Sequence, residues 1–325
     1  MYKVTVIVPV YNAEKYLGRC LKSLFEQTLD SIEYIFIDDC SSDNSVKILQ
    51  QTIAEYPHRS AHARILRMSK NSGSAAVRKL GMEMANGEYI IHCDSDDWVD
   101  VDMYRLMYDK AVDGNYDIVV SRYVLAYDTY IDGNIYFVPD SHYSDKFKLI
   151  SDLIQPGSNL NNVWSKLVKR RLYCDSNFTF PLEDMGEDMA IMCQLFYLSD
   201  RVGYIDKSLY FYYQNQGSIS NSSGGNKELK RVCQIKNNFD LILRFLEINK
   251  VIDSFKSEIF IRKLAIKERV RACISNDETY HIWRNIYPEI NFMTVTSLRL
   301  KIIYLLTYLK LDSIFKKIKK VIISQ

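Results

Sequence analysis

The chain has 325 residues, of which 47% are hydrophobic and 25% are charged, a balance that is typical of a globular protein and excludes an intrinsically disordered one. The net charge is only +2, so we expect no nucleic-acid partner. The seven cysteines are dispersed, odd in number and without a C-x-x-C pair, which argues against a disulfide framework or a zinc site and favours a reducing compartment.

The N-terminus runs directly into an apolar strand pattern, and no stretch of about 18 apolar residues occurs. We therefore expect no secretion signal and no membrane-spanning segment. These features predict a cytoplasmic protein, either free or attached peripherally to the inner face of the cell membrane.

Strand and helix patterns alternate through the first 125 residues. Short apolar runs predict strands at 4–10, 34–37, 65–66, 89–92 and 117–120. Amphipathic patterns predict helices between them, and Asn12 is a candidate N-cap for the first helix. Strands that alternate with helices of this length predict an α/β fold with a mostly parallel sheet and helices on both faces.

Two of the predicted strands end in carboxylates, at Asp38-Asp39 and at the segment 94–97, Asp-Ser-Asp-Asp. In a parallel sheet both ends face one ligand crevice. Clustered carboxylates there suit Mg²⁺ or Mn²⁺, which shares its oxygen ligands with substrate phosphates. The alternative is a solvated acidic turn that caps the helix after Asp100.

The phosphate-binding loops of other nucleotide enzymes are absent from the sequence. It contains neither G-x-x-x-x-G-K-[ST] nor G-x-G-x-x-G, which argues against a P-loop NTPase and a dinucleotide-dependent dehydrogenase. Arg78 is a candidate contact for a diphosphate. A solvated charge on the helix surface is the alternative interpretation of this arginine.

Several spaced motifs together resemble the GT-A fold family 2 glycosyltransferases of bacterial glycan and capsule polysaccharide biosynthesis. These motifs lie, in order, at 8–12 (Val-Pro-Val-Tyr-Asn), 37–39 (Ile-Asp-Asp), 71–73 (Asn-Ser-Gly) with Arg78 and Gly81, 87–90 (Gly-Glu-Tyr-Ile) and 94–97 (Asp-Ser-Asp-Asp). The resemblance covers roughly residues 3–220. Cys40 and Ser72 depart from it, because each stands where glycine is common in the family.

The resemblance implies a role for each matching residue. The loop after the first strand and the second strand's aspartate would hold the base of a nucleotide-sugar, through Pro9, Val10, Tyr11 and Asp39. The D-x-D element would hold the ribose through Asp94 and the metal through Asp96, with Ser95 beside them and Asp97 in support. Arg78 would complete the donor site.

The region 126–225 would form the acceptor half of the site. Glu187 and Asp188 precede an apolar pattern that predicts a helix, and its dipole would keep a carboxylate at the N-terminus ionised and able to accept a proton. The resemblance assigns the general base to Asp188, with Glu187 as the supporting acid. Trp164 is either a platform for the acceptor sugar or a core residue.

Residues 226–325 are poor in glycine and proline and predict a helical appendage, so we expect a catalytic domain at 1–225, with halves at 1–125 and 126–225, and a helical region at 226–325. The tail from Arg299 to Gln325 alternates apolar runs with lysines. It would lie on a membrane surface, pack on the protein's own helices or pair two subunits in a homodimer.

Together these features predict an inverting, metal-dependent glycosyltransferase. It would move a sugar from a UDP-sugar or related nucleotide-sugar to a hydroxyl of a glycan or lipid-linked acceptor. Two alternatives remain open. One is a nucleotidyltransferase acting on a sugar phosphate, and the other is a sugar-binding scaffold without activity.

Overall fold

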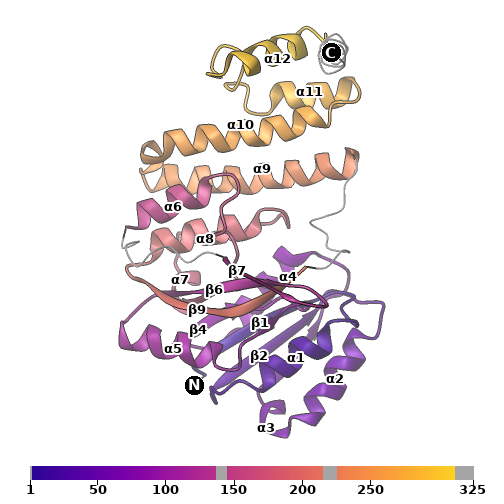
Figure 1. Ribbon diagram of the computed structural model, residues 1–325, viewed down its shortest axis with the longest axis vertical. Coiled ribbons are helices and arrows are strands. Elements are labelled where there is room, and N and C mark those ends of the chain that lie inside the picture. The colour runs from indigo at the N-terminus through magenta and orange to yellow at the C-terminus, as the bar shows by residue number, and fades with distance from the viewer. Residues whose placement is uncertain (1, 137–144, 215–224, 312–325) are drawn as a thin grey trace. The chain divides into compact units, whose positions relative to one another are not determined.

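The computed structural model describes residues 2–136, 145–214 and 225–311 (Figure 1). The chain divides into two compact units. One unit contains Met1–Ser222 and Asn237–Ser254, and the other contains Ser223–Lys236 and Phe255–Gln325. The functional boundary expected at residue 225 stays a prediction, since the first unit also includes part of the chain beyond it.

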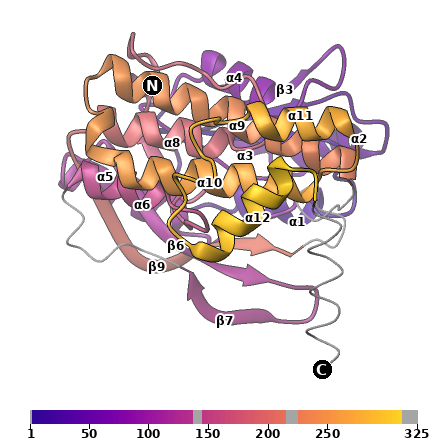
Figure 2. The same ribbon diagram turned by 90° about the horizontal axis from the view of Figure 1, so that it is seen from above.

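A mixed β-sheet forms the centre of the first unit. Within the described residues its strands follow the order β3-β2-β1-β4-β8-β6-β9-β5, and β7 pairs with β6. Figures 1 and 2 show β6 and β7 side by side from two directions. The strands are β1 (Val4–Val10), β2 (Ile32–Asp38), β3 (Ala63–Arg67), β4 (Tyr89–His92), β5 (Trp98–Val99), β6 (Ile118–Ala126), β7 (Ile131–Tyr136), β8 (Lys166–Lys169) and β9 (Val202–Tyr213).

The predicted α/β fold is confirmed, and the parallel pattern holds for its first half. Strands β1 to β4 pair in parallel. Beyond β4 the sheet is mixed, because β8 lies antiparallel to both β4 and β6, and β5 lies antiparallel to β9. The strand expected at 117–120 begins β6, which β8 separates from β4.

Helices cover both faces of the sheet, as predicted. Alternate residues of β1 point to opposite faces. Val4, Val6 and Val8 pack with α1, α2 and α5, whereas Ile7 packs with α4. The helices of this unit before α9 are α1 (Leu17–Phe25), α2 (Ser45–Glu55), α3 (Pro57–Ser60), α4 (Ser74–Met84), α5 (Met103–Asp113), α6 (Lys146–Ile154), α7 (Arg170–Tyr173) and α8 (Glu187–Leu198).

Two loop residues, Asn12 after β1 and Cys40 after β2, have positive φ angles. Asn12 does not cap a helix, because α1 begins only at Leu17. Instead, Asn12 has a positive φ of 47°, and its side-chain oxygen accepts a hydrogen bond from the Ser42 N–H at 2.9 Å. Cys40 has a φ of 64°, in the left-handed region that favours glycine, so its backbone adopts the conformation that the family's usual glycine would adopt easily.

The second unit is helical, as predicted. Helix α9 (Gly225–Ile248) belongs in part to each unit, and it is followed by α10 (Lys256–Ala272), α11 (Asp277–Asn285) and α12 (Leu298–Tyr308). The fully buried Trp283 packs against Tyr304 and Tyr308, with ring centroids 5.6 and 4.9 Å away. Within the described residues, each helix is too short or too polar to cross a bilayer.

Candidate active site

The predicted acidic edge forms where β1, β2 and β4 end. Val10 pairs with Asp38, and Ile7 pairs with His92, so the segments that follow β2 and β4 leave the sheet at the same edge. Pro9 and Val10 lie in β1, and the Val10 carbonyl accepts the Asp39 N–H at 2.8 Å. The side chain of Tyr11 is 47% exposed directly beyond β1. The structure therefore brings the predicted base-binding residues together.

Asp39 joins this edge to the N-terminus of α4. Its two carboxylate oxygens accept the N–H groups of Ser72 at 2.7 Å and Gly73 at 2.9 Å. A carboxylate oxygen can accept a second hydrogen bond, so these contacts leave capacity for a donor base. Gly73 has a φ of 86°, and an added Cβ would clash with the carboxylate of Asp184. A side chain at position 73 would thus distort the loop that Asp39 holds.

The three carboxylates of the acidic loop lie in three different environments. Asp97 is fully buried and accepts hydrogen bonds from the Tyr210 hydroxyl at 2.6 Å and the Tyr213 N–H at 2.7 Å. Burial, with Asp96 and Asp94 adding to it, raises the pKa of Asp97 well above its usual range. Asp94 is about 30% exposed and pairs with Arg78 at 2.7 Å. Asp97 thus anchors the loop, whereas Asp94 faces the interior of the site.

Asp96 is the loop carboxylate that best fits a metal. It is partly exposed, and its backbone carbonyl accepts a hydrogen bond from Arg19 at 3.2 Å. Among the described residues, no three His, Cys, Asp or Glu side chains are grouped as a ready-made metal site. Mg²⁺ commonly uses only one or two protein carboxylates together with substrate phosphates, so a single well-placed aspartate is compatible with its binding.

Arg78 connects the acidic loop to the Glu187–Asp188 pair. It is only 5% exposed, which excludes the alternative of a solvated surface charge. One terminal nitrogen bonds Asp94, and the other bonds Glu187 and lies 3.8 Å from Asp188. Burial would lower the pKa of Arg78, but the three carboxylates outweigh it and raise that pKa. Contact between Arg78 and a donor diphosphate stays a prediction.

Glu187 and Asp188 begin α8 as predicted, but burial dominates their ionisation. Glu187 is 3% exposed and accepts the Ser74 hydroxyl at 2.8 Å. Its pKa is raised to about 8, chiefly by burial, although Arg78 lowers it. Burial also raises the pKa of Asp188, against the lowering effects of Arg78 and Lys166. The helix dipole therefore does not set the protonation of this pair by itself.

Asp188 retains an unused acceptor atom. Its carboxylate receives a hydrogen bond from the Val163 N–H. Its Oδ1 atom is buried and accepts no hydrogen bond within the described part of the chain. A carboxylate with a raised pKa and a free lone pair has the properties of a general base.

Trp164 belongs to the core. It is 6% exposed and stacks on Tyr210 and Tyr212, with ring centroids at 4.2 and 5.4 Å, and it meets Tyr123 edge-on at 4.7 Å. These contacts support the core interpretation of the sequence. Stacking of Trp164 on an acceptor sugar stays a prediction.

Two residues near the site were missed by sequence reasoning. Asp184 accepts the Ala75 N–H at 3.1 Å and packs against Gly73 at the start of α4. Lys166 is 1% exposed. The sequence holds no signal for its burial, because an isolated lysine is usually solvated.

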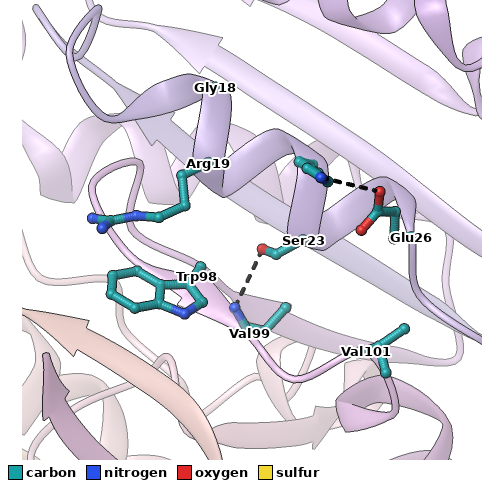
Figure 3. Close-up of a pocket in the computed structure, with 8 residues that line it drawn as sticks. Gly18, Arg19, Ser23, Glu26, Trp98, Val99 and Val101 are labelled. Atoms are coloured by element: carbon teal, nitrogen blue, oxygen red, sulfur yellow. Dashed lines mark hydrogen bonds and ion pairs between the residues drawn. The ribbon is translucent and has the colours of Figure 1, made fainter. Parts of the chain in front are cut away.

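A hollow of about 430 Å³ lies beside the acidic loop, between α1 and the segment 98–101 (Figure 3). The Arg19 side chain extends from α1 over the indole of Trp98, with the guanidinium 3.7 Å from the ring centroid. Phe211 also stacks on this indole at 5.4 Å. Arg19 and Phe211 thus compete with any ligand for the faces of the indole. Arg19 also contacts the Asp96 carbonyl, so the pair of Arg19 and Trp98 braces the acidic loop.

Residues 5–164 match the model of the family described as glycosyl transferase family 2. This segment of the chain belongs to glycosyl transferase family 2. Among curated relatives, Glycosyltransferase GlyA of Streptococcus pneumoniae is 34% identical over 225 residues, which are 67% of this chain and 31% of that protein. The match to this relative therefore spans less than a third of its length.

Two solved structures share the fold of this chain. S. aureus TarS 1-349 in complex with UDP-GlcNAc has a TM-score of 0.61 at 18% identity, over 86% of this chain and 83% of that one. The mannosyltransferase PcManGT from Pyrobaculum calidifontis, in complex with GDP-Man and Mn²⁺, has a TM-score of 0.56 at 14% identity, over 87% and 79%. At these identities the likeness establishes a GT-A type fold.

Proposed function

We propose that this chain is an inverting, metal-dependent glycosyltransferase. It takes its sugar from a UDP-sugar or related nucleotide-sugar and transfers it to a hydroxyl of a glycan or lipid-linked acceptor. The observation that carries the proposal is the arrangement around Arg78, which joins Asp94 of the D-x-D loop to Asp188. A donor site and a candidate base are thus linked through one buried cation.

The donor occupies the edge formed by β1, β2 and the acidic loop. Tyr11 and Asp39 bind the base, and Asp94 and Ser95 bind the ribose. Asp96 holds Mg²⁺ or Mn²⁺, and when bound this cation neutralises charge on the leaving diphosphate. The complexes of TarS with UDP-GlcNAc and of PcManGT with GDP-Man and Mn²⁺ support a nucleotide-sugar and a divalent cation here.

Asp188 acts as the general base. Its Oδ1 accepts the proton of the acceptor hydroxyl while that oxygen forms a bond to the anomeric carbon. The bond from that carbon to the diphosphate breaks, and the diphosphate leaves with the electron pair. A single displacement of this kind inverts the anomeric configuration, whereas a nucleophilic carboxylate would retain it through a covalent intermediate.

A screen of nucleotide-sugars with Mn²⁺, with Mg²⁺ and with a chelator tests this function by measuring the release of nucleoside diphosphate. We expect release from one pyrimidine nucleotide-sugar, and only with metal. Release of pyrophosphate from a nucleoside triphosphate and a sugar phosphate would identify a nucleotidyltransferase instead. Donor binding without any turnover would identify an inactive sugar-binding scaffold.

We further propose that the protein acts at the cytoplasmic face of the membrane, through its C-terminal region. Four apolar side chains at helical spacing, three on α12 and one at its C-cap, are exposed: Leu298 by 73%, Ile302 by 46%, Leu305 by 42% and Leu309 by 57%. Residues 296–325 contain seven Lys or Arg and one Asp, a net charge of +6 in a chain whose total is +2. Near anionic lipid, each basic residue contributes about 1 kcal/mol.

Flotation with anionic and with neutral liposomes tests the membrane contact. The full chain should float with anionic liposomes in a salt-sensitive manner, and Ile302→Glu/Leu305→Glu should reduce the floating fraction. Binding to neither liposome, together with a dimeric mass that the double substitution lowers, would assign this face to a homodimer. If the substitutions change neither liposome binding nor the mass of the protein, the proposed membrane contact is wrong.

A further inference from the structure

Lys166, the first residue of β8, is a buried charge that packing alone does not explain. It is 1% exposed, and a buried ammonium costs several kcal/mol unless it is paired or hydrogen-bonded. Its Nζ donates to the Asn162 carbonyl at 2.6 Å, to Asn162 Oδ1 at 2.8 Å and to the Ser165 hydroxyl at 3.2 Å. Three acceptors match the three protons of an ammonium group, so the geometry suits the charged form.

These acceptors all belong to the turn 162–165, which contacts the candidate base. The Val163 N–H of this turn bonds the carboxylate of Asp188. Trp164 of the same turn stacks on Tyr210 at 4.2 Å, and the Tyr210 hydroxyl donates to Asp97. Lys166 therefore holds the turn that bridges Asp188 and the anchor of the acidic loop.

The charge of Lys166 also acts on Asp188. Four other titratable or charged groups face that carboxylate: Arg78 on α4, Asp94 after β4, Glu187 on α8 and Tyr173 on α7. Arg78 is shared with Asp94 and Glu187, so it cannot compensate Asp188 alone. Lys166 lowers the pKa of Asp188. Burial in turn lowers the pKa of Lys166 to about 7, and Asp188 opposes that effect.

We propose that Lys166 is a positioning residue for the base. Its ammonium holds the turn 162–165, whose Val163 N–H bonds the Asp188 carboxylate, and adds a second buried cation to the site. The proposal rests on the assignment of Asp188 as the base in the proposed glycosyl transfer. It goes beyond that assignment, because it names a second cation in the site and a role that needs no contact with donor or metal.

Titration of the full chain by NMR, with ¹³C-labelled aspartate carboxylates, tests this without substrate. The Asp188 signal is identified by its loss in Asp188→Asn. In Lys166→Met the pKa of Asp188 should rise, whereas Ser165→Ala, which removes one acceptor but keeps the ammonium, should leave it unchanged. An unchanged pKa in Lys166→Met would overturn the proposal, whatever the enzyme assays show.

A second measurement needs no neutral substitution, in case Lys166→Met does not fold. In the unsubstituted chain the loss of the Lys166 proton near pH 7 should give the Asp188 signal a second inflection. Lys166→Arg should remove this inflection, because a guanidinium keeps its charge throughout the range. A second inflection that persists in Lys166→Arg would contradict the proposal, because a group other than Lys166 would then cause it. Failure of Asp188 as base would appear only in turnover assays and leaves these titrations intact.

Discussion

Two carboxylates of the donor edge, Asp39 and Asp97, are held by different partners from those at the start of α8. Asp39 and Asp97 accept hydrogen bonds from nearby N–H and hydroxyl groups, and neither has an ion pair at its carboxylate among the described contacts. Glu187 and Asp188 instead share Arg78, which also binds Asp94. The donor edge is therefore built from neighbouring strand ends, whereas the base depends on a cluster of buried charges from several elements.

The comparison shows how one site can both bind a donor and hold a general base. Neutral donors hold Asp39 and Asp97 in place, and the hydrogen bonds from Tyr210 and Tyr213 oppose the effect of burial on the pKa of Asp97. Buried cations and carboxylates shift one another's pKa, which a base requires and a structural anchor does not. Substitutions in the charge cluster should thus change turnover and pH dependence, whereas those at the donor edge should change binding.

The largest expected effect is at the base. Asp188→Asn should lower turnover by about 10²–10⁴-fold, because an amide cannot accept the acceptor's proton, while UDP affinity should stay unchanged. Rates of nucleoside diphosphate release and calorimetry with UDP provide the two readouts. Asp200→Asn, at a carboxylate 81% exposed on the surface, is the matched control. A variant with more than about a tenth of the parent rate would show that another residue is the base.

The second effect concerns the buried cation. Arg78→Met should lower the free energy of unfolding by about 3 kcal/mol, since it leaves Asp94, Glu187 and Asp188 without their shared partner. Urea unfolding at neutral pH measures this. The control is Lys79→Met on the same helix, whose exposed pair with Glu83 at 3.9 Å should contribute about 0–1 kcal/mol. Equal unfolding midpoints for the two variants would contradict the charge-cluster interpretation.

A smaller effect is expected at the donor edge. Asp96→Asn should weaken Mn²⁺-dependent UDP binding by about tenfold or more, or about 1.4 kcal/mol, because a neutral amide is a poorer ligand for a hard cation. Calorimetry with UDP and Mn²⁺, and again with a chelator, separates the metal's contribution. Asp109→Asn on α5, at a side chain 54% exposed, should bind like the parent. Unchanged metal-dependent affinity in Asp96→Asn would remove Asp96 as the metal ligand.

The last prediction concerns the slope of stability with pH. The pKa of Glu187 is raised from 4.5 to about 8, so between these values the folded chain keeps a proton that the unfolded chain releases. The free energy of unfolding should therefore fall as pH rises through this window, by at most about 1.4 kcal/mol per pH unit.

Glu187→Gln should flatten that slope, because glutamine does not titrate. Urea unfolding at several pH values between 5 and 8 gives the measurement, with Glu83→Gln at a 60% exposed side chain as control. A slope that persists unchanged in Glu187→Gln would show that other groups cause the pH dependence.

The sequence by itself determined the parallel first half of the sheet and the acidic edge. Both are local consequences of the pattern, since apolar β-branched runs such as 4–10 form buried strands and polar residues follow where the strands end. The start of α8 at Glu187 was predictable for the same reason. The spaced motifs around Asp39, Arg78 and Asp94 also carried the family resemblance, which the family model matches.

Only the tertiary structure decided which charges are buried and which of them meet. The sequence marked Arg78 and Glu187 as candidate site residues but did not predict that they, or Lys166, are buried, because their burial depends on the packing of α4, β8 and α8. The antiparallel insertion of β8 between β4 and β6 has no local signal either. Long-range packing sets desolvation, and desolvation is the largest of the effects on the pKa of Asp188.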